Sequence, residues 1–264
     1  PALGFASAAD ALQPETIETP TLPCAFENEF YLAKIDKNGY LTSLVERKSG
    51  CELIHAQVDG RPVPFGALTM QLDNGDNWWS LSTPHLNRKT QGYVMNRPDP
   101  LFQESINTFM PTIERAEVVR ADADELVIRQ TGCVRYWIVK VSFTTTITLS
   151  KSVREIAYHT EFTCESKNLR IRAAFPVENL PERRRQIPYA IAPFGDSEQT
   201  TQMFMDAQNG QAGLAVLNAG TPAGNIDDGV MMLTLFRSVA MEYKCDSDLS
   251  YNIGRAFAFD YAVC

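Results

Sequence analysis

The clearest absences in this 264-residue sequence are of histidine and of clustered basic charge. It contains three histidines, and its formal net charge at pH 7 is -8. The one basic run, Arg183-Arg184-Arg185, stands beside Pro181 and Glu182, and we expect it to be a solvated loop. Nucleic-acid binding depends on cationic neutralisation of phosphates. We therefore expect this acidic chain not to bind nucleic acid.

Long apolar runs and targeting signals are missing as well. No stretch of 18 or more apolar residues occurs, so the sequence predicts no membrane-spanning helix. The first four residues lack the charged segment and apolar core of a secretory signal. The chain begins with Pro1 rather than Met, which we interpret as the mark of a processed or excised part of a longer protein.

Cysteine is too sparse for a disulfide scaffold. Six cysteines in 264 residues are too few for a disulfide-rich protein, and none is arranged as C-x-x-C. We expect buried free thiols that act as small hydrophobes, which favours a cytoplasmic location. The six residues are Cys24, Cys51, Cys133, Cys164, Cys245 and Cys264.

No motif in the sequence selects a catalytic centre. A catalytic zinc usually takes three protein ligands, and His55, His85 and His159 show no H-x-x-x-H, H-x-D or H-E-x-x-H spacing. We therefore expect no metal site and no cofactor in this chain. Composition leaves a Ser-His-Asp triad open, but no G-x-S-x-G elbow and no glycine-rich phosphate loop is present. Many carboxylates could form a glycosidase pair, yet no pair is singled out.

What the sequence does contain is β-strand alternation over a substantial core. Hydrophobic residues make up 44% of the chain and aromatic residues 10%. Residues 30–35 and 40–45 read as two strands joined by the turn Asp36-Lys37-Asn38-Gly39. Cys133–Leu149 carries the strongest strand pattern, with apolar residues on one face and Ser and Thr on the other.

The same alternation continues at residues 156–163 and 169–175, and we expect these three long strands to form one meander. Arg170 and Arg172 should then lie on its solvated face. Further strands are expected at 213–217, 230–236 and 256–263. The residues predicted to form the core are Phe143, Ile147, Ile156, Tyr158, Phe162, Ile171 and Phe175.

The domain organisation follows from proline content and from the absence of helical periodicity. No window shows an apolar stripe of period 3.6, and no βαβ alternation occurs. The sequence therefore predicts an all-β fold: one large, mainly antiparallel β-sandwich over residues 24–264. Residues 1–23 carry Pro14, Pro20 and Pro23 and are expected to be an extended linker.

One loop has the residue types of a sugar-binding rim. Asp73–Trp79 combines two adjacent indoles, Trp78 and Trp79, with Asp and Asn side chains. Sugar C–H faces stack on aromatic rings while hydroxyls take polar partners. We predict that Asp76, Trp78 and Trp79 contact carbohydrate. The alternative is a pair of indoles that plugs the end of the sandwich, with Asp and Asn making the turn.

Five blocks of sequence, in order along the chain, together resemble one known family. Their resemblance is to the C-terminal β domain of glycoside hydrolase family 38, the α-mannosidases, over about residues 24–264. The blocks are Glu27-Asn28-Glu29-Phe30-Tyr31 through Ser43-Leu44, the strands from Gly132 to Val177, Gly213-Leu214-Ala215-Val216-Leu217-Asn218, Leu233-Thr234-Leu235-Phe236-Arg237-Ser238, and Phe257-Ala258-Phe259-Asp260-Tyr261-Ala262.

The resemblance implies a galactose-mutarotase-like supersandwich that serves a retaining α-mannosidase. In this family the zinc ligands and the nucleophilic Asp belong to an N-terminal catalytic domain. No position here matches them, so the resemblance places zinc in that domain and implies that the two partners of this chain are its own N-terminal domain and a mannoside. Residues 219–224 depart from the family's Lys-Tyr-Gly-Tyr turn, and residues 192–206 have fewer aromatic residues than expected.

Two other functions remain open. An autonomous sugar mutarotase or epimerase on the same fold needs a paired histidine and carboxylate. His159 and Glu161 share one face of their strand and could supply it. A purely structural domain without sugar contact is the second alternative. The preferred interpretation is an accessory domain that supports the substrate cleft and is catalytically silent alone.

Overall fold

The computed structural model describes residues 20–55, 57–58, 61–72, 108–166, 169–177, 180–195, 198–227, 229–238 and 254–264. These residues form strands, turns and bends, and helix is absent from all of the ranges just given. Accordingly, no helix in this part of the chain has the length and apolar character needed to cross a membrane. The predicted all-β class is confirmed.

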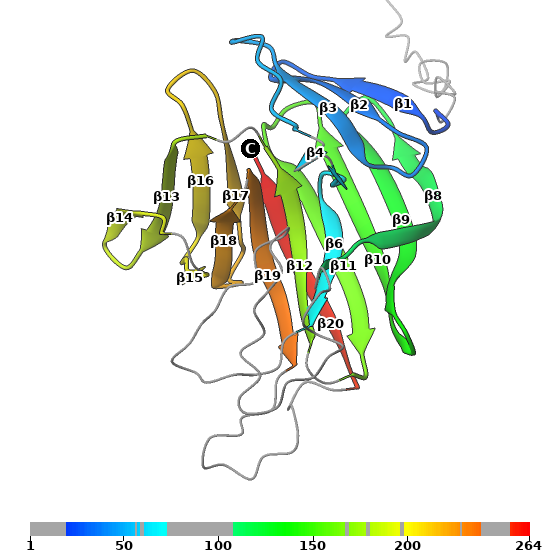
Figure 1. Cartoon of the computed structure of the whole chain (residues 1–264). Helices are drawn as coiled ribbons and strands as arrows, with labels where there is room; N and C mark the ends of the chain where they lie inside the picture. The colour runs from blue at the N-terminus through cyan, green and yellow to red at the C-terminus, as the bar shows by residue number, and fades with distance from the viewer. Residues whose placement is uncertain are drawn as a thin grey trace, which may run out of the picture.

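Two antiparallel sheets make up the sandwich (Figure 1). The six-stranded sheet has the order β15 (Gln199–Thr200), β18 (Ala223–Asp227), β19 (Val230–Ser238), β12 (Leu169–Pro176), β6 (Ala67–Leu72) and β7 (Thr108–Phe109). The nine-stranded sheet has the order β14 (Ala190–Pro193), β13 (Glu182–Ile187), β16 (Phe204–Gln208), β17 (Gly213–Leu217), β20 (Arg255–Val263), β11 (Ile156–Cys164), β10 (Val139–Ser150), β9 (Glu125–Tyr136) and β8 (Pro111–Ala121).

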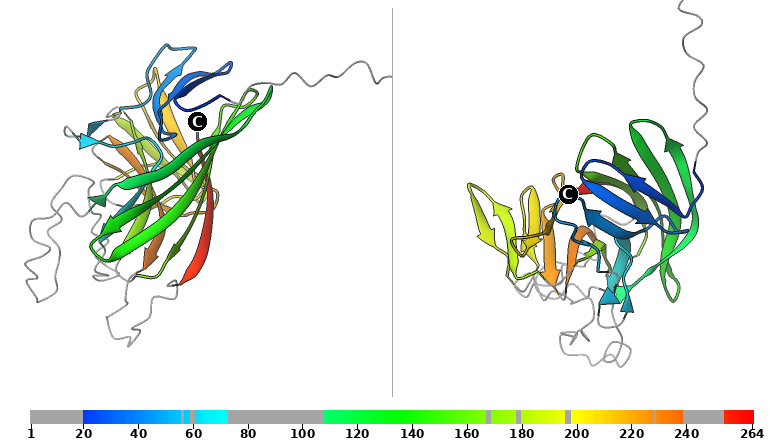
Figure 2. Two further views of the ribbon diagram at one scale, coloured as in Figure 1. Left: turned by 90° about the vertical axis from the view of Figure 1, so that its right-hand side faces the viewer. Right: turned by 90° about the horizontal axis from the view of Figure 1, so that it is seen from above.

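Two small sheets complete the described structure. β1 (Cys24–Glu27), β2 (Tyr31–Ile35) and β3 (Leu41–Glu46) form a three-stranded sheet. In the view from above it lies beside the β8–β9–β10 end of the larger sheet (Figure 2). The amide side chain of Asn28 donates to the carbonyl of Ser150 at the end of β10, 2.8 Å away, which ties this hairpin to the sandwich. β4 (Gln57–Val58) and β5 (Arg61–Pro62) pair with each other.

The core lies between the two large sheets and contains all seven residues predicted to form it. Each of them is at most 5% exposed. Rings from opposite sheets meet there: Phe175 of β12 packs edge-on against Tyr158 of β11 at a centroid distance of 5.5 Å. Phe236 of β19 meets Phe162 of β11 at 5.7 Å. The period-two alternation of the sequence therefore identified the buried face correctly.

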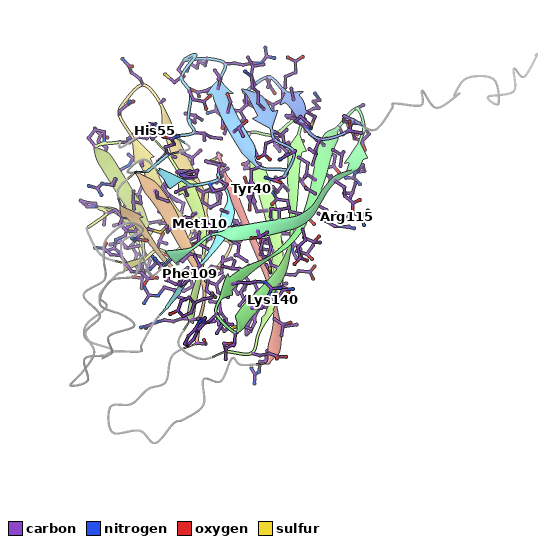
Figure 3. The ribbon with its side chains drawn as sticks, turned by 45° about the vertical axis from the view of Figure 1, so that its right-hand side comes forward. Tyr40, His55, Phe109, Met110, Arg115 and Lys140 are labelled. Atoms are coloured by element: carbon purple, nitrogen blue, oxygen red, sulfur yellow. The ribbon has the colours of Figure 1, made fainter. Side chains whose placement is uncertain are left out.

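One side of the sandwich is closed by a strand that changes sheets. β7 pairs with β6 in the six-stranded sheet, and β8, which follows directly, pairs with β9 in the nine-stranded sheet. Met110 stands at the corner between them, and Figure 3 shows β8 sweeping from Met110 toward Arg115. The two layers are thus joined covalently along this side.

The run Cys133–Leu149 is a hairpin and not a single strand. β9 ends at Tyr136, Trp137 and Ile138 form the turn, and β10 begins at Val139. Trp137 has a φ of 54°, a conformation that usually requires Gly, Asn or Asp. The prediction failed here because alternation continues through the turn and no typical turn residue marks it.

The predicted three-strand meander is also wrong. β10 and β11 are neighbours as expected, but the other edge of β11 is occupied by β20. β12 instead lies in the opposite sheet, between β6 and β19. The physical reason is that all eight residues of β12 are buried. A strand buried on both faces belongs in the interior of a covered sheet.

The run Arg183-Arg184-Arg185 is part of strand β13 and not a solvated loop. Each guanidinium finds a partner on a neighbouring segment: Arg183 donates to the carbonyl of Ile226 at 3.0 Å and Arg185 to that of Thr200 at 2.6 Å. Arg184 Nε lies 3.2 Å from both carboxylate oxygens of Asp206 on β16. These partners come from distant parts of the chain, so local charge alone gave the wrong prediction.

The cysteines of the described ranges are free thiols, as predicted, but the expected burial holds for two of the five. Cys133 and Cys164 are buried, whereas Cys24, Cys51 and Cys264 are half-buried. Burial raises the pKa of the Cys164 thiol, which keeps that sulfur in its neutral form. Cys245 lies outside the described residues.

Phe162→Ala tests the core directly. Phe162 is 4% exposed and packs against Phe236, Phe257 and Phe259. We expect the substitution to lower the free energy of unfolding by about 3–5 kcal/mol, because a cavity replaces the ring. Thr163→Ala, on the exposed face of the same strand, is the control and should cost well under half of that. Denaturant unfolding measures both, and similar values for the two variants would contradict the assigned core.

Candidate functional site

The predicted sugar-contacting residues Asp76, Trp78 and Trp79 lie outside the described residues. Their segment follows β6, which ends at Leu72. Leu72 pairs with Leu169 at the start of β12, and Leu169 pairs on its other side with Ser238 at the end of β19. β6 therefore ends beside the first residue of the central strand β12.

A buried cluster of charged side chains lies near the end of β6 and the start of β12. Arg170 and Arg172 of β12 are 2% and 0% exposed. Glu198, from the connection between β14 and β15, meets both: its Oε2 is 2.5 Å from Arg170 Nη1 and 3.2 Å from Arg172 Nη2. Thr234 of β19 accepts from Arg172 Nε at 3.1 Å and donates to Glu198 Oε1. Three segments far apart in sequence are held together by one carboxylate.

The charge of Glu198 depends on this arrangement. Burial by itself would raise the pKa of its carboxyl. The guanidiniums of Arg172 and Arg170, the Thr234 hydroxyl and the charge of Arg237 outweigh burial, so the pKa is lowered below its ordinary value. Glu198 is therefore a carboxylate at neutral pH, and the cluster is an ion network rather than a set of neutral polar groups.

A buried amide lies on the same face of the six-stranded sheet. Asn225 of β18 is 1% exposed and pairs with Met232, whose sulfur is 3.7 Å from Arg172 Nη1. Neither side-chain polar atom of Asn225 has a hydrogen-bond partner among the described residues. An unpaired buried amide carries a cost in desolvation free energy.

The sequence did not reveal this cluster. Arg170 and Arg172 were expected on a solvated face, and that expectation is wrong: both are buried, with Glu198 as their counter-charge and Thr234 as an acceptor for Arg172. The one available signal was the run Ala173-Ala174-Phe175-Pro176 after Arg172, which has no polar side chain and is typical of a strand buried on both faces. The carboxylate partner is 28 residues away from Arg170 and has no local signature.

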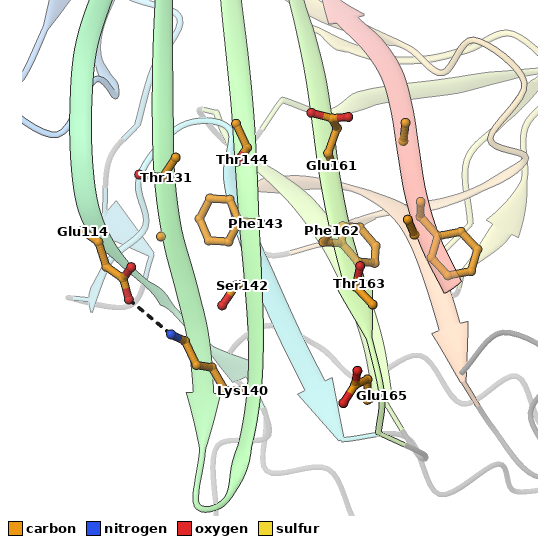
Figure 4. A pocket seen from close by; sticks show the side chains of 14 residues that line it. Glu114, Thr131, Lys140, Ser142, Phe143, Thr144, Glu161, Phe162, Thr163 and Glu165 are labelled. Atoms are coloured by element: carbon orange, nitrogen blue, oxygen red, sulfur yellow. Dashed lines mark hydrogen bonds and ion pairs between the residues drawn. The ribbon is translucent and has the colours of Figure 1, made fainter. Parts of the chain in front are cut away.

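The outer face of the nine-stranded sheet is lined by small and polar side chains. Ser142, Thr144, Glu161, Thr163 and Ala258 surround a shallow hollow of about 720 Å³. Figure 4 shows Glu114 and Lys140 facing one another at its side, where their charged atoms are 3.5 Å apart. The short side chains among those that line the hollow are Ser142, Thr144, Thr163 and Ala258, and longer charged side chains stand around them.

His159 stands on this face between two carboxylates. Its Nδ1 is 2.6 Å from Asp260 Oδ1, and its Nε2 is 3.9 Å from Glu161 Oε1. His159 and Glu161 thus share a face, as the epimerase alternative requires.

The acidic and imidazole side chains of this face do not gather into a metal centre. Over the residues that the structure describes, no three His, Cys, Asp or Glu side chains are placed to hold one metal ion. The side chains of His159, Glu161 and Asp260 are 43%, 59% and 77% exposed. Exposed ion pairs of this kind contribute little to stability.

Glu198→Gln tests whether the buried carboxylate holds the cluster. We expect the substitution to lower the free energy of unfolding by about 3–5 kcal/mol at pH 7, because two guanidiniums would stay buried with less counter-charge. Glu161→Gln removes an exposed carboxylate and should have an effect close to zero.

The lowered pKa of Glu198 predicts that the stability difference between the parent and Glu198→Gln depends on pH. The folded-state pKa of Glu198 is lowered, so its stabilising contribution is complete above the ordinary carboxyl pKa of 4.5 and is lost as pH falls through the folded value. The difference between the parent and Glu198→Gln should therefore shrink below pH 4.5. A difference that stays constant down to acid pH would contradict the assignment.

Comparison with known proteins defines the family. Residues 26–243 match the model of the glycosyl hydrolases family 38 C-terminal domain. An α-mannosidase from Enterococcus faecalis V583 superposes with a TM-score of 0.69 and 14% identity, covering 92% of this chain and 29% of that chain. A protein of glycosyl hydrolase family 38 from Enterococcus faecalis gives a TM-score of 0.66 and 15% identity, covering 92% and 30%.

A third match is more distant. A galactose mutarotase-like protein from Lactobacillus casei ATCC 334 matches with a TM-score of 0.43 and 10% identity, covering 92% of this chain and 99% of that chain. None of the curated protein sequences matches. The present chain spans less than a third of the length of the two family 38 structures. It belongs to the family of glycosyl hydrolases family 38 C-terminal domains.

Proposed function

We propose that this chain is the accessory, carbohydrate-associated β domain of an α-mannosidase-like glycoside hydrolase, and that it is catalytically silent alone. The observation that carries the proposal is the family match over residues 26–243, together with the greater length of the two family 38 structures. The same fold occupies 29% of the Enterococcus α-mannosidase, so the relative has a large additional part. We assign the chemistry of this protein to such a part.

The proposed catalytic silence rests on the sequence. The three histidines have no metal-ligand spacing, and the family resemblance places zinc and the nucleophile in an N-terminal domain. The proposed partners are therefore an N-terminal catalytic domain of the same protein and a mannoside.

Support of the substrate cleft is the second part of the proposal. Asp76, Trp78 and Trp79 follow β6, whose end pairs with the start of β12. The Glu198 ion network lies directly beside this end and ties β12 to β19 and to the β14–β15 connection. The end of β6 is fixed in this way and can position a following segment that contacts sugar, because positioning groups act best on rigid elements.

The isolated 264-residue chain is expected to bind no stoichiometric zinc and to hydrolyse no aryl α-mannoside. Elemental analysis and a chromogenic assay measure the two properties. A longer polypeptide that includes an N-terminal catalytic domain should show both zinc and turnover. Stoichiometric zinc in this chain, lost on chelation together with turnover, would contradict the proposal.

Trp78→Ala and Trp79→Ala in the full-length enzyme test the predicted rim. We expect KM to rise by up to about tenfold, since an aromatic contact is worth about 0.5–1.5 kcal/mol. The unfolding free energy of the β domain should not change. Trp137→Ala removes an 82% exposed indole from a turn of the other sheet and is the matched control. If both indoles instead plug the core, either substitution will destabilise the fold by several kcal/mol and KM will follow only the folded fraction.

A further inference from the structure

A second hollow on the outer face of the nine-stranded sheet has the shape and lining of a small-molecule site. Its volume is about 590 Å³. The floor is formed by Ala157 of β11 and Ala262 of β20, which pair directly across the two strands. Larger side chains flank them in the same row, because Ala262 pairs with Leu217 and Ala157 pairs with Thr148. Two adjacent alanines between larger neighbours make a depression with an apolar floor.

The next row of the same strands is polar and borders the floor. Thr146, His159 and Asp260 pair across β10, β11 and β20, and all three line the hollow. Asp260 binds the His159 ring through Oδ1, which orients its carboxylate. Its Oδ2 has no partner among the described residues, and the side chain is 77% exposed. An oriented acceptor thus stands at the rim of an apolar floor.

The opposite wall is a ridge that comes from outside the central strands. Met203, 54% exposed, and Ala219 line the hollow there. The backbone amide of Asn218 donates to the carbonyl of Met203 at 2.9 Å, and its buried side chain donates to that of Thr201 at 3.0 Å. These bonds hold the ridge in place, while the flexible thioether of Met203 can adjust to a ligand.

We propose that this hollow binds a hexopyranose unit of a glycan. A pyranose presents an apolar C–H face to the alanine floor and to the neighbouring Leu217 and Met203, and hydroxyls to Asp260, His159 and Thr146. The class of ligand rests on the proposed function. The position of the site rests on the structure alone: the hollow lies on the face of the nine-stranded sheet that is turned away from the six-stranded sheet. Its role would be to hold a glycan, without any catalytic step.

The affinity of this site should be low. Tyr158 and Tyr261 line the hollow but are 1% and 3% exposed, so no aromatic face of theirs is available for stacking. An open site that offers an aliphatic floor and a few polar groups is expected to bind one sugar unit with a Kd on the order of 1 mM. The neighbouring hollow of 720 Å³ is bordered by Glu114, Glu161 and Glu165 and lacks a comparable apolar floor.

Replacing either of two alanines by leucine tests the proposal on the 264-residue chain. Ala157→Leu fills the floor of the hollow, and Ala258→Leu adds the same volume on the same face in the neighbouring hollow. Both alanines are exposed, so neither change disturbs the core. Binding of methyl α-D-mannopyranoside is followed by NMR titration of each variant, and denaturant unfolding confirms that each is folded.

We expect the parent and Ala258→Leu to bind with similar Kd values and Ala157→Leu to bind at least tenfold more weakly. Asp260→Asn, which keeps the size of the side chain, should weaken binding several-fold. No shift in the parent at sugar concentrations well above 10 mM, or equal binding by the parent and Ala157→Leu, would overturn the proposal. Either result would leave the accessory role untouched, since that role is tested by zinc and turnover in the longer polypeptide.

Discussion

The ion network around Glu198 is the interaction on which the six-stranded sheet depends. β12 is the central strand of that sheet and is buried on both faces, so Arg170 and Arg172 carry their charges into the interior. Two unpaired buried guanidiniums would be strongly destabilising. Glu198 supplies the counter-charge, and Thr234 bridges the carboxylate to Arg172. The same contacts fix β12 against β19.

The position of Glu198 in the chain extends this constraint to both layers. It stands between β14, at one edge of the nine-stranded sheet, and β15, at one edge of the six-stranded sheet. The ion pairs therefore anchor a connection that crosses from one sheet to the other. The β7–β8 corner makes a second crossing at the opposite edges of both sheets. With both sides closed, the six-stranded sheet is held firmly at the end of β6, after which the predicted rim residues follow in sequence. The nine-stranded sheet keeps an exposed outer face.

Local pattern predicted most of the strands but few of their long-range relations. Alternation located β10 and β11 and the buried face they share, because side-chain direction follows from period two alone. It could not place β12 in the opposite sheet, since strand pairing is decided by contacts distant in sequence. Nor could it find the turn at Trp137, which carries no typical turn residue. For the site, the chemistry of Arg170 was misjudged because its partner Glu198 lies 28 residues away. Asp76, Trp78 and Trp79 lie outside the described residues, so their predicted role stays a prediction.

That this domain serves a catalytic domain encoded ahead of it is tested most directly by reading the coding sequence upstream of Pro1. An open reading frame that continues without interruption into an α/β domain with an H-x-D zinc motif is the predicted result. An initiation codon immediately before Pro1, with no such domain in frame, would contradict the assignment of an accessory role.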